Sequence, residues 1–243
     1  MTLLAENLER VEEAITTACR KAGRHRGEVE LMAVSKTYPA ETVIAAAELG
    51  LRMFGESRVQ EFAAKSPALE GWRAGGSNAA ADEPLLVHLI GHLQSNKAAR
   101  AVELFDAVDS VDSLRLAEKL NEAAARLGKR LDILVEINMG GEEAKSGLAP
   151  DSSELLALLD AQARLTHLNV RGCMTVPPYT EDPEGARVYF RKLSELRDRL
   201  RVRSGLPLEE LSMGMSHDFE VAIEEGSTCV RVGTAIFGER SYQ

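Results

Sequence analysis

The sequence has few cysteines, and those it has are scattered. Cys19, Cys173 and Cys229 are odd in number and far apart, without the close pairs that cysteine metal sites usually show. Free thiols in a reducing cytosol are therefore the simplest interpretation. Because Cys173 and Cys229 lie in apolar runs, we expect both to pack in the core.

Excess positive charge and long apolar stretches are also missing. The formal net charge is -9, whereas a general nucleic-acid binder would usually be basic. No uninterrupted apolar stretch is long enough to span a bilayer. The N-terminus lacks the basic and then apolar segments of a signal peptide. We therefore expect a cytoplasmic protein that has neither nucleic-acid nor membrane partners.

The chain has enough apolar residues, 44% of the total, for a full hydrophobic core. Short apolar runs bounded by breakers predict strands, and apolar residues three and four apart predict helices. The predicted strands are 29–35, 52–55, 85–90, 105–108, 131–137, 168–174, 210–213 and 229–232. The predicted helices are 3–22, 40–48, 57–65, 95–104, 113–127, 151–163, 183–204 and 218–225.

The alternation of these elements decides the fold class. Alternating βα units imply parallel strands, and eight of them fit a (β/α)8 TIM barrel, which takes about 250 residues. We expect residues 1–243 to form this single domain, with an extra N-terminal helix filling the gap after the last strand. An open doubly wound sheet would normally show a glycine-rich loop after the first strand, and Ser35–Pro39 contains none. Residues 66–84, rich in glycine, alanine and proline, predict a flexible surface insertion.

Lys36 follows the first predicted strand and precedes Pro39. A lysine at the end of a buried strand lies where the core opens to solvent. Dry surroundings there would favour the neutral amine, a nucleophile that can form a Schiff base. The alternative is a lysine that only extends its charge to water.

Polar residues follow several predicted strands, where the active groups of a barrel lie. Gly233 and Thr234 follow the last strand, and there the glycine permits close approach, the threonine supplies a hydroxyl, and free N–H groups point outward. Ser216 is a second donor after the preceding strand, and phosphate sites in barrels recur after strands seven and eight. Each motif alone could be a turn or tight packing, but together they predict a phosphate-binding cup.

Because a barrel closes on itself, Lys36 would lie beside this cup. A lysine amine near a phosphate site is the arrangement that pyridoxal phosphate needs. Arg231 on the last strand would point into the mouth of the barrel and meet the pyridine nitrogen. Since arginine stays charged, that nitrogen would remain unprotonated and the ring would be a weak electron sink.

Six segments occur in an order that resembles the pyridoxal phosphate homeostasis proteins (the YggS/PROSC family). They are 33–37, 54–61, 88–97, 144–147, 211–216 and 230–238. The resemblance runs through nearly the whole chain and implies a single barrel like the N-terminal domain of alanine racemase. It also implies that Lys36 bears the cofactor, that Ser216, Gly233 and Thr234 hold its phosphate, and that Arg231 faces the ring nitrogen.

The chain departs from the usual residues of that family at three positions. Ser57 stands where asparagine is usual, His92 where proline is common, and Val87 where an aromatic residue is common. None of these differences involves the lysine or the phosphate cup. We count Ser57 and Met215 with the expected cofactor-binding residues.

Other side chains could carry chemistry but have a simpler interpretation. His88, His92 and His217 come from separate loops without ligand spacing, so we expect no metal site but surface or capping roles. Asn96 and Lys97 could simply cap a helix. Lys145 could be a secondary amine for pyridoxal phosphate, although a solvated loop lysine is the better interpretation.

We therefore expect a carrier or buffer of pyridoxal phosphate, a cytoplasmic monomer whose recipients are pyridoxal-phosphate-dependent apo-enzymes. The alternative is an amino-acid racemase of low activity that uses Lys36 as base. A two-base racemase needs a second acid or base, which in alanine racemases is a tyrosine from a second domain of the partner subunit. We expect no such domain here, and Tyr38 and Tyr179, the tyrosines nearest to strand ends, have no clear partner.

Overall fold

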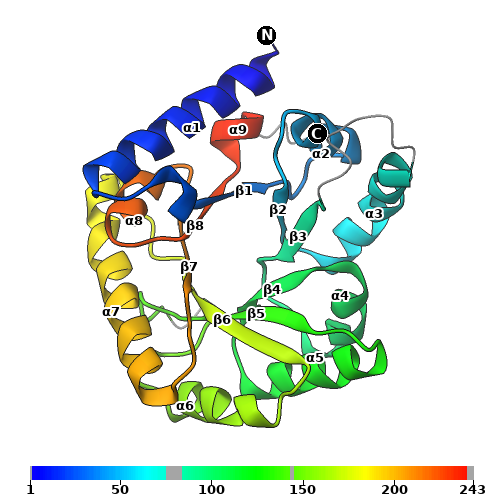
Figure 1. The fold of residues 1–243 in the computed structure, drawn as a ribbon, viewed down its shortest axis with the longest axis vertical. Helices are drawn as coiled ribbons and strands as arrows, with labels where there is room; N and C mark the ends of the chain where they lie inside the picture. The colour runs from blue at the N-terminus through cyan, green and yellow to red at the C-terminus, as the bar shows by residue number, and fades with distance from the viewer. Residues whose placement is uncertain (1, 75–83, 143–144, 240–243) are drawn as a thin grey trace.

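The computed structural model describes residues 2–74, 84–142 and 145–239, and its strands form a closed parallel barrel (Figure 1). Each strand pairs with the next along the chain, and β8 pairs with β1. The strands are β1 (Glu30–Val34), β2 (Met53–Glu56), β3 (Leu86–Leu89), β4 (Ala107–Val111), β5 (Leu131–Glu136), β6 (Leu168–Met174), β7 (Glu210–Met215) and β8 (Cys229–Val232). The predicted (β/α)8 barrel is confirmed.

Helices surround the barrel (Figure 1). They are α1 (Leu3–Lys21), α2 (Ala40–Glu48), α3 (Val59–Ala74), α4 (Ala98–Leu104), α5 (Leu114–Arg126), α6 (Ser153–Asp160), α7 (Arg187–Ser204), α8 (Phe219–Glu224) and α9 (Thr234–Phe237). Short 3-10 turns are η1 (Arg26–Glu28), η3 (Ser95–Lys97), η4 (Ala161–Ala163) and η5 (Pro183–Ala186). Within the described ranges, no helix is long and apolar enough to cross a bilayer.

The N-terminal helix α1 completes the outer ring, as predicted. It begins at the cap Thr2 and buries Val11, Ile15 and Ala18 along one face. That face packs against α8 and α9 (Figure 1). A buried hydrogen bond from Asn7 Nδ2 to the carbonyl of Ile236, 2.9 Å long, ties α1 to the chain beyond the last strand.

One continuous apolar cluster of strand and helix residues forms the core. It includes Phe54 of β2, Ile133 of β5 and Phe190 of α7, all fully buried. Cys173 and Cys229 are buried as predicted, and burial raises the pKa of each thiol to about 12. Neither thiol is therefore ionised at neutral pH, and neither has nucleophilic character.

The predicted end of the third helix at residue 65 is wrong, because α3 continues through Pro67 to Ala74. Proline cannot donate the backbone hydrogen bond that the carbonyl of Ala63 would accept in a regular helix. The hydroxyl of Ser66 donates to that carbonyl instead, at 3.5 Å. Residues 66–74 of the expected insertion are therefore helical, while 75–83 lie outside the described residues.

The fourth strand also differs from the predicted 105–108, since β4 begins at Ala107 and continues to Val111. Ser110 is fully buried there, and its hydroxyl donates to the carbonyl of Gly91 at 2.7 Å. A buried hydroxyl with a partner is tolerated inside a barrel. The polar sequence of this segment therefore concealed the end of the strand.

Candidate functional site

The C-terminal ends of parallel strands meet at one end of a barrel, and Lys36 lies at that end. It follows β1 by two residues and is half-buried. The turn that carries it is bonded to its surroundings, since the Ser35 amide donates to Gly55 and the Tyr38 amide donates back to Ser35. Thr37 adopts a φ of 72°, in the left-handed region that branched residues rarely occupy.

The predicted phosphate cup lies beside Lys36 because β8 pairs with β1, with Val232 opposite Ala33. Gly233 lies against the end of β1, since a Cβ atom on it would lie 3.4 Å from the Cβ and from the carbonyl oxygen of Val34. The hydroxyl oxygen of Ser216 accepts hydrogen bonds from the amides of Gly233 at 3.1 Å and Ala235 at 3.4 Å.

Arg231 points into the barrel from β8 and is 3% exposed. Its Nη1 donates to the hydroxyl of Ser212 at 2.7 Å, and its Nη2 donates to the carbonyl of Thr175 at 2.8 Å. Burial lowers the pKa of the guanidinium from its ordinary value, but a guanidinium stays charged in proteins. The structure therefore holds a fixed positive charge inside the barrel.

Ser57, Met215 and Thr234 lie at the same end of the barrel. Ser57 follows β2 and is half-buried. Its backbone packs closely on Gly91, because a Cβ atom added to Gly91 would lie 2.4 Å from the carbonyl oxygen of Ser57. Met215 ends β7, and its amide donates to Asp218 at 2.7 Å. Thr234 begins α9 and is exposed. The structure thus brings the predicted site residues to one end of the barrel.

Sequence reasoning did not single out Glu136, which ends β5 and is 7% exposed. The hydroxyl of Ser146 donates to its Oε1 at 2.9 Å, while its buried Oε2 has no hydrogen-bond partner. Burial raises the pKa of this carboxyl, against the hydrogen bond from Ser146. The available signal was a carboxylate directly after the apolar run Ile133–Val135, at the C-terminal end of the strand.

The segment after β5 is built around Glu136. Gly147 has a φ of 106°, and a Cβ there would lie 2.8 Å from the amide nitrogen of Asn138 and 3.3 Å from the Cγ of Glu136. The amide of Leu148 donates to the Glu136 carbonyl at 2.8 Å. This packing gives the Ser146–Gly147 pair a physical role, which is to hold the carboxyl at the end of the strand.

Of the three candidate histidines, one is largely buried and two are exposed. The expected surface or capping role is wrong for His88, which is largely buried and has its Nδ1 3.1 Å from Asp109 Oδ1. His92 is exposed and pairs with Asp112 at 2.9 Å, and His217 is exposed beside Tyr179. Among the described residues, no group of three or more potential metal ligands is arranged around one point.

The remaining candidates have ordinary contacts. Lys145 pairs with Glu142 at 2.7 Å in its loop, which agrees with a solvated lysine. The hydroxyl of Tyr38 donates to the carbonyl of Gly238 at 2.8 Å, and Tyr179 is 78% exposed. Asn96 and Lys97 form part of the 3-10 turn η3 before α4.

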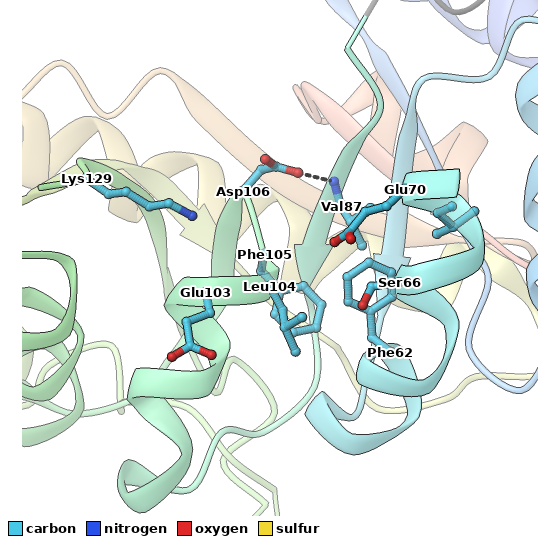
Figure 2. A pocket seen from close by; sticks show the side chains of 10 residues that line it. Phe62, Ser66, Glu70, Val87, Glu103, Leu104, Phe105, Asp106 and Lys129 are labelled. Carbon is cyan, nitrogen blue, oxygen red and sulfur yellow. Dashed lines mark hydrogen bonds between the residues drawn. The ribbon is translucent and has the colours of Figure 1, made fainter. Parts of the chain in front are cut away.

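A cavity of about 220 Å³ lies away from these strand ends, between α3 and α4 (Figure 2). Phe62 and Ser66 of α3 line one side, and Glu103 and the adjoining Phe105 line the other. None of the predicted site residues lines it, so it is separate from the candidate site.

Comparison with known proteins assigns the class of this barrel. A family model described as "Alanine racemase, N-terminal domain" matches residues 7–241. Two curated pyridoxal phosphate homeostasis proteins are similar over nearly the whole chain. The protein of Aquifex aeolicus is 44% identical, and the match covers 98% of this chain and 98% of that protein. The protein of Pseudomonas aeruginosa is 42% identical, and the match covers 100% of this chain and 98% of that protein. The chain belongs to the family of pyridoxal phosphate homeostasis proteins.

A solved structure of a relative is also similar. PipY of Synechococcus elongatus, with PLP bound, superposes with a TM-score of 0.80 at 35% identity. The match covers 97% of this chain and 100% of PipY.

Replacing Glu136 by Gln should stabilise the apoprotein at neutral pH by about 1 kcal/mol, since the variant has no charge to bury. Because the folded-state pKa is raised, the folded protein keeps this proton to a higher pH than the unfolded chain. The stability of the native sequence therefore falls as pH rises above the ordinary pKa of 4.5. Denaturant unfolding of both proteins at several pH values measures the difference.

The expected gain grows as pH rises from 4.5 and vanishes below that value. Glu122→Gln is the control, because Glu122 is exposed and Lys119 lowers its pKa. That variant should gain no stability with rising pH. A gain in stability of Glu136→Gln that did not depend on pH would contradict the raised pKa of Glu136.

Proposed function

We propose that this protein binds pyridoxal 5'-phosphate as a Schiff base on Lys36 and serves as a carrier or buffer of the cofactor. The observation that carries the proposal is the pairing of β1 with β8, which sets Val34, two residues before Lys36, against Gly233, whose amide donates to Ser216. Two facts about relatives support it: the curated ones are named for pyridoxal phosphate homeostasis, and PipY was solved with PLP bound.

The residues present suit a phosphate group. The amides of Gly233 and Ala235 converge on one oxygen, that of Ser216. Because this oxygen accepts both hydrogen bonds, the hydroxyl keeps its own hydrogen for donation to an anion. The hydroxyl of Thr234, exposed at the start of α9, is a further donor. The hydroxyls of Ser216 and Thr234 are thus the donors offered to a phosphate oxygen, while the amides of Gly233 and Ala235 hold the Ser216 hydroxyl in place.

Lys36 would hold the cofactor covalently. The lone pair of its neutral amine forms a bond to the aldehyde carbon, and both amine hydrogens leave with the aldehyde oxygen as water. The bond reverses by the same route, which allows the cofactor to be released. A reversible bond to a sequestered aldehyde suits a carrier that supplies pyridoxal-phosphate-dependent apo-enzymes.

Arg231 supports a carrier more than a catalyst. Its guanidinium donates hydrogen bonds and accepts none, so a ring nitrogen facing it would stay unprotonated. Bound pyridoxal phosphate supplies electron-sink chemistry, which is weak without that proton. The bonds from Arg231 to Ser212 and Thr175 hold the guanidinium in place. That the protein works as a cytoplasmic monomer stays a prediction.

A racemase of low activity is the second candidate, and Glu136 is the observation that favours it. The strand that it ends, β5, lies across the ring from β1, four strands away in either direction. Burial raises the pKa of the Glu136 carboxyl, which suits a group that takes up and returns a proton. The tyrosines are less suited, because the Tyr38 hydroxyl is bonded to Gly238 and Tyr179 is exposed.

After incubation with pyridoxal phosphate and removal of the unbound cofactor, Lys36→Ala should be colourless and the native protein yellow, because only the amine of residue 36 forms the bond. Visible absorption spectra, followed by borohydride reduction and peptide mapping, locate the modified lysine. Lys145→Ala is the matched control and should behave like the native protein. An unchanged spectrum for Lys36→Ala would sink the proposal.

Ser216→Ala should weaken the affinity for pyridoxal phosphate by about tenfold, the effect of losing one hydrogen bond to a charged group. Affinity for pyridoxal, which lacks the phosphate, should stay unchanged. Fluorescence titration with both compounds measures the two values. The exposed Ser153→Ala is the control. Equal weakening for both compounds would show that Ser216 does not contact the phosphate.

Proton–deuterium exchange at the α-carbon separates the two candidate functions. A carrier should exchange the α-hydrogen of a panel of amino acids far more slowly than dedicated enzymes, which turn over about 1–1000 times per second. Nuclear magnetic resonance of the amino acids follows the exchange. Rates in the enzymatic range, abolished by Glu136→Gln, would establish the racemase instead.

A further inference from the structure

The backbone on both sides of Lys36 is held from helix α3. Before it, the carbonyl of Ser35 accepts a hydrogen bond from Lys65 Nζ at 3.0 Å. After it, the amide of Thr37 donates to the carboxylate of Glu61. Glu61 and Lys65 are four residues apart, so they lie on one face of α3. The turn that carries the Lys36 side chain is thus fixed at two points by one rigid element.

Lys65 is the centre of this arrangement. Its Nζ lies 2.8 Å from Glu56 Oε1 and 2.8 Å from Glu61 Oε1, in addition to the bond to Ser35. These three acceptors match the three hydrogens of an ammonium group. The hydroxyl of Ser35 also donates to Glu56 Oε1, at 2.8 Å. We call Glu56, Glu61 and Lys65 the charge network.

The charge network is expensive in free energy. Lys65 is 8% exposed and Glu56 1%, and the Oε2 of Glu56 is buried without a hydrogen-bond partner. Burial raises the pKa of Glu56 even though Lys65 stands beside it. Taking such charges out of water costs free energy that apolar side chains of similar size would not. Stability alone therefore does not account for these residues.

The backbone conformation of Thr37 also indicates that the turn after β1 is held by its surroundings. Its φ of 72° is unfavourable for a branched residue and persists only where the surroundings enforce it. The bond from its amide to Glu61 is one such constraint. Burial alone would raise the pKa of Glu61, but the hydrogen bonds from Lys65 and from the Thr37 amide lower it. Glu61 is therefore held ionised, as a strong acceptor.

We propose that the charge network positions Lys36, by fixing the turn so that its amine is aimed at an aldehyde whose phosphate lies in the cup of Ser216 and Gly233. Glu56, Glu61 and Lys65 are positioning residues, since they act through the backbone of residues 35 and 37. The inference rests on the proposed function of Lys36. It adds that the rate of bond formation depends on α3, while phosphate binding does not.

The test uses Glu61→Ala and Glu61→Gln, because Glu61 is the least buried member and its loss threatens folding least. Alanine removes the acceptor of the Thr37 amide, whereas glutamine keeps an acceptor oxygen. Lys65→Met is the stronger second variant. Glu122→Ala is the matched control, because it breaks an exposed ion pair with Lys119 on α5.

Three quantities are measured: the rate of Schiff-base formation with pyridoxal phosphate by stopped-flow absorbance, competition by inorganic phosphate, and hydrogen exchange of the Thr37 amide in the apoprotein. Glu61→Ala should slow bond formation by about tenfold to a hundredfold, the effect of misplacing a reacting group. It should speed Thr37 exchange at least about tenfold and leave phosphate competition unchanged. In Glu61→Gln, the rates of bond formation and of Thr37 exchange should both return most of the way to the native values. Lys65→Met should form the bond at least as slowly as Glu61→Ala.

Bond formation at the native rate in Glu61→Ala, with faster Thr37 exchange, would overturn the inference, since the turn would be loosened without consequence. An equal decrease in the rate of bond formation in Glu61→Ala and Glu61→Gln would also overturn the inference. If Lys65→Met does not fold, the Glu61 pair decides. Failure of the proposed function is distinguishable, because the native protein itself would then form no bond at Lys36.

Discussion

The hydrogen bonds between β1 and β8 close the barrel, and the candidate site depends on them. They join the first strand to the last, with Glu30 opposite Cys229 and Ala33 opposite Val232. Closure leaves no strand edge unpaired. It also sets Val34, two residues before Lys36, against Gly233, although the two residues come from opposite ends of the chain. Helix α1 packs over this junction against α8 and α9, which helps to keep the first and last strands together.

Several buried charges lie near the C-terminal ends of the strands, at the same end of the barrel as Lys36. The core consists of apolar side chains, yet Glu56, Glu136 and Arg231 are all nearly inaccessible to water. In each of the two glutamates, one buried carboxylate oxygen has no hydrogen-bond partner, which packing for stability alone would avoid. Such local violations of the rules that stabilise a fold are expected at functional sites, where the rest of the structure compensates for them.

The sequence predicted the elements well where a local pattern was strong, and poorly where a distant partner decided. β6 and β8 have the predicted bounds, because apolar runs that end at breakers are a local signal. The end of α3 was missed, because a proline was taken as a breaker while Ser66 supplies the bond that Pro67 cannot. His88 was misplaced, because its partner Asp109 comes from the neighbouring strand β4.

The sequence by itself determined the order of strands and helices and the chemical groups that end them, including Lys36, Ser216, Arg231 and Gly233. These follow from hydrophobic period and turn residues, which act between neighbours in the chain. Only the tertiary structure decided that Glu136 is buried beside Ser146 and that α3 holds the Lys36 turn through Lys65. Burial and long-range hydrogen bonds arise when closure brings distant segments together, and no local pattern records them.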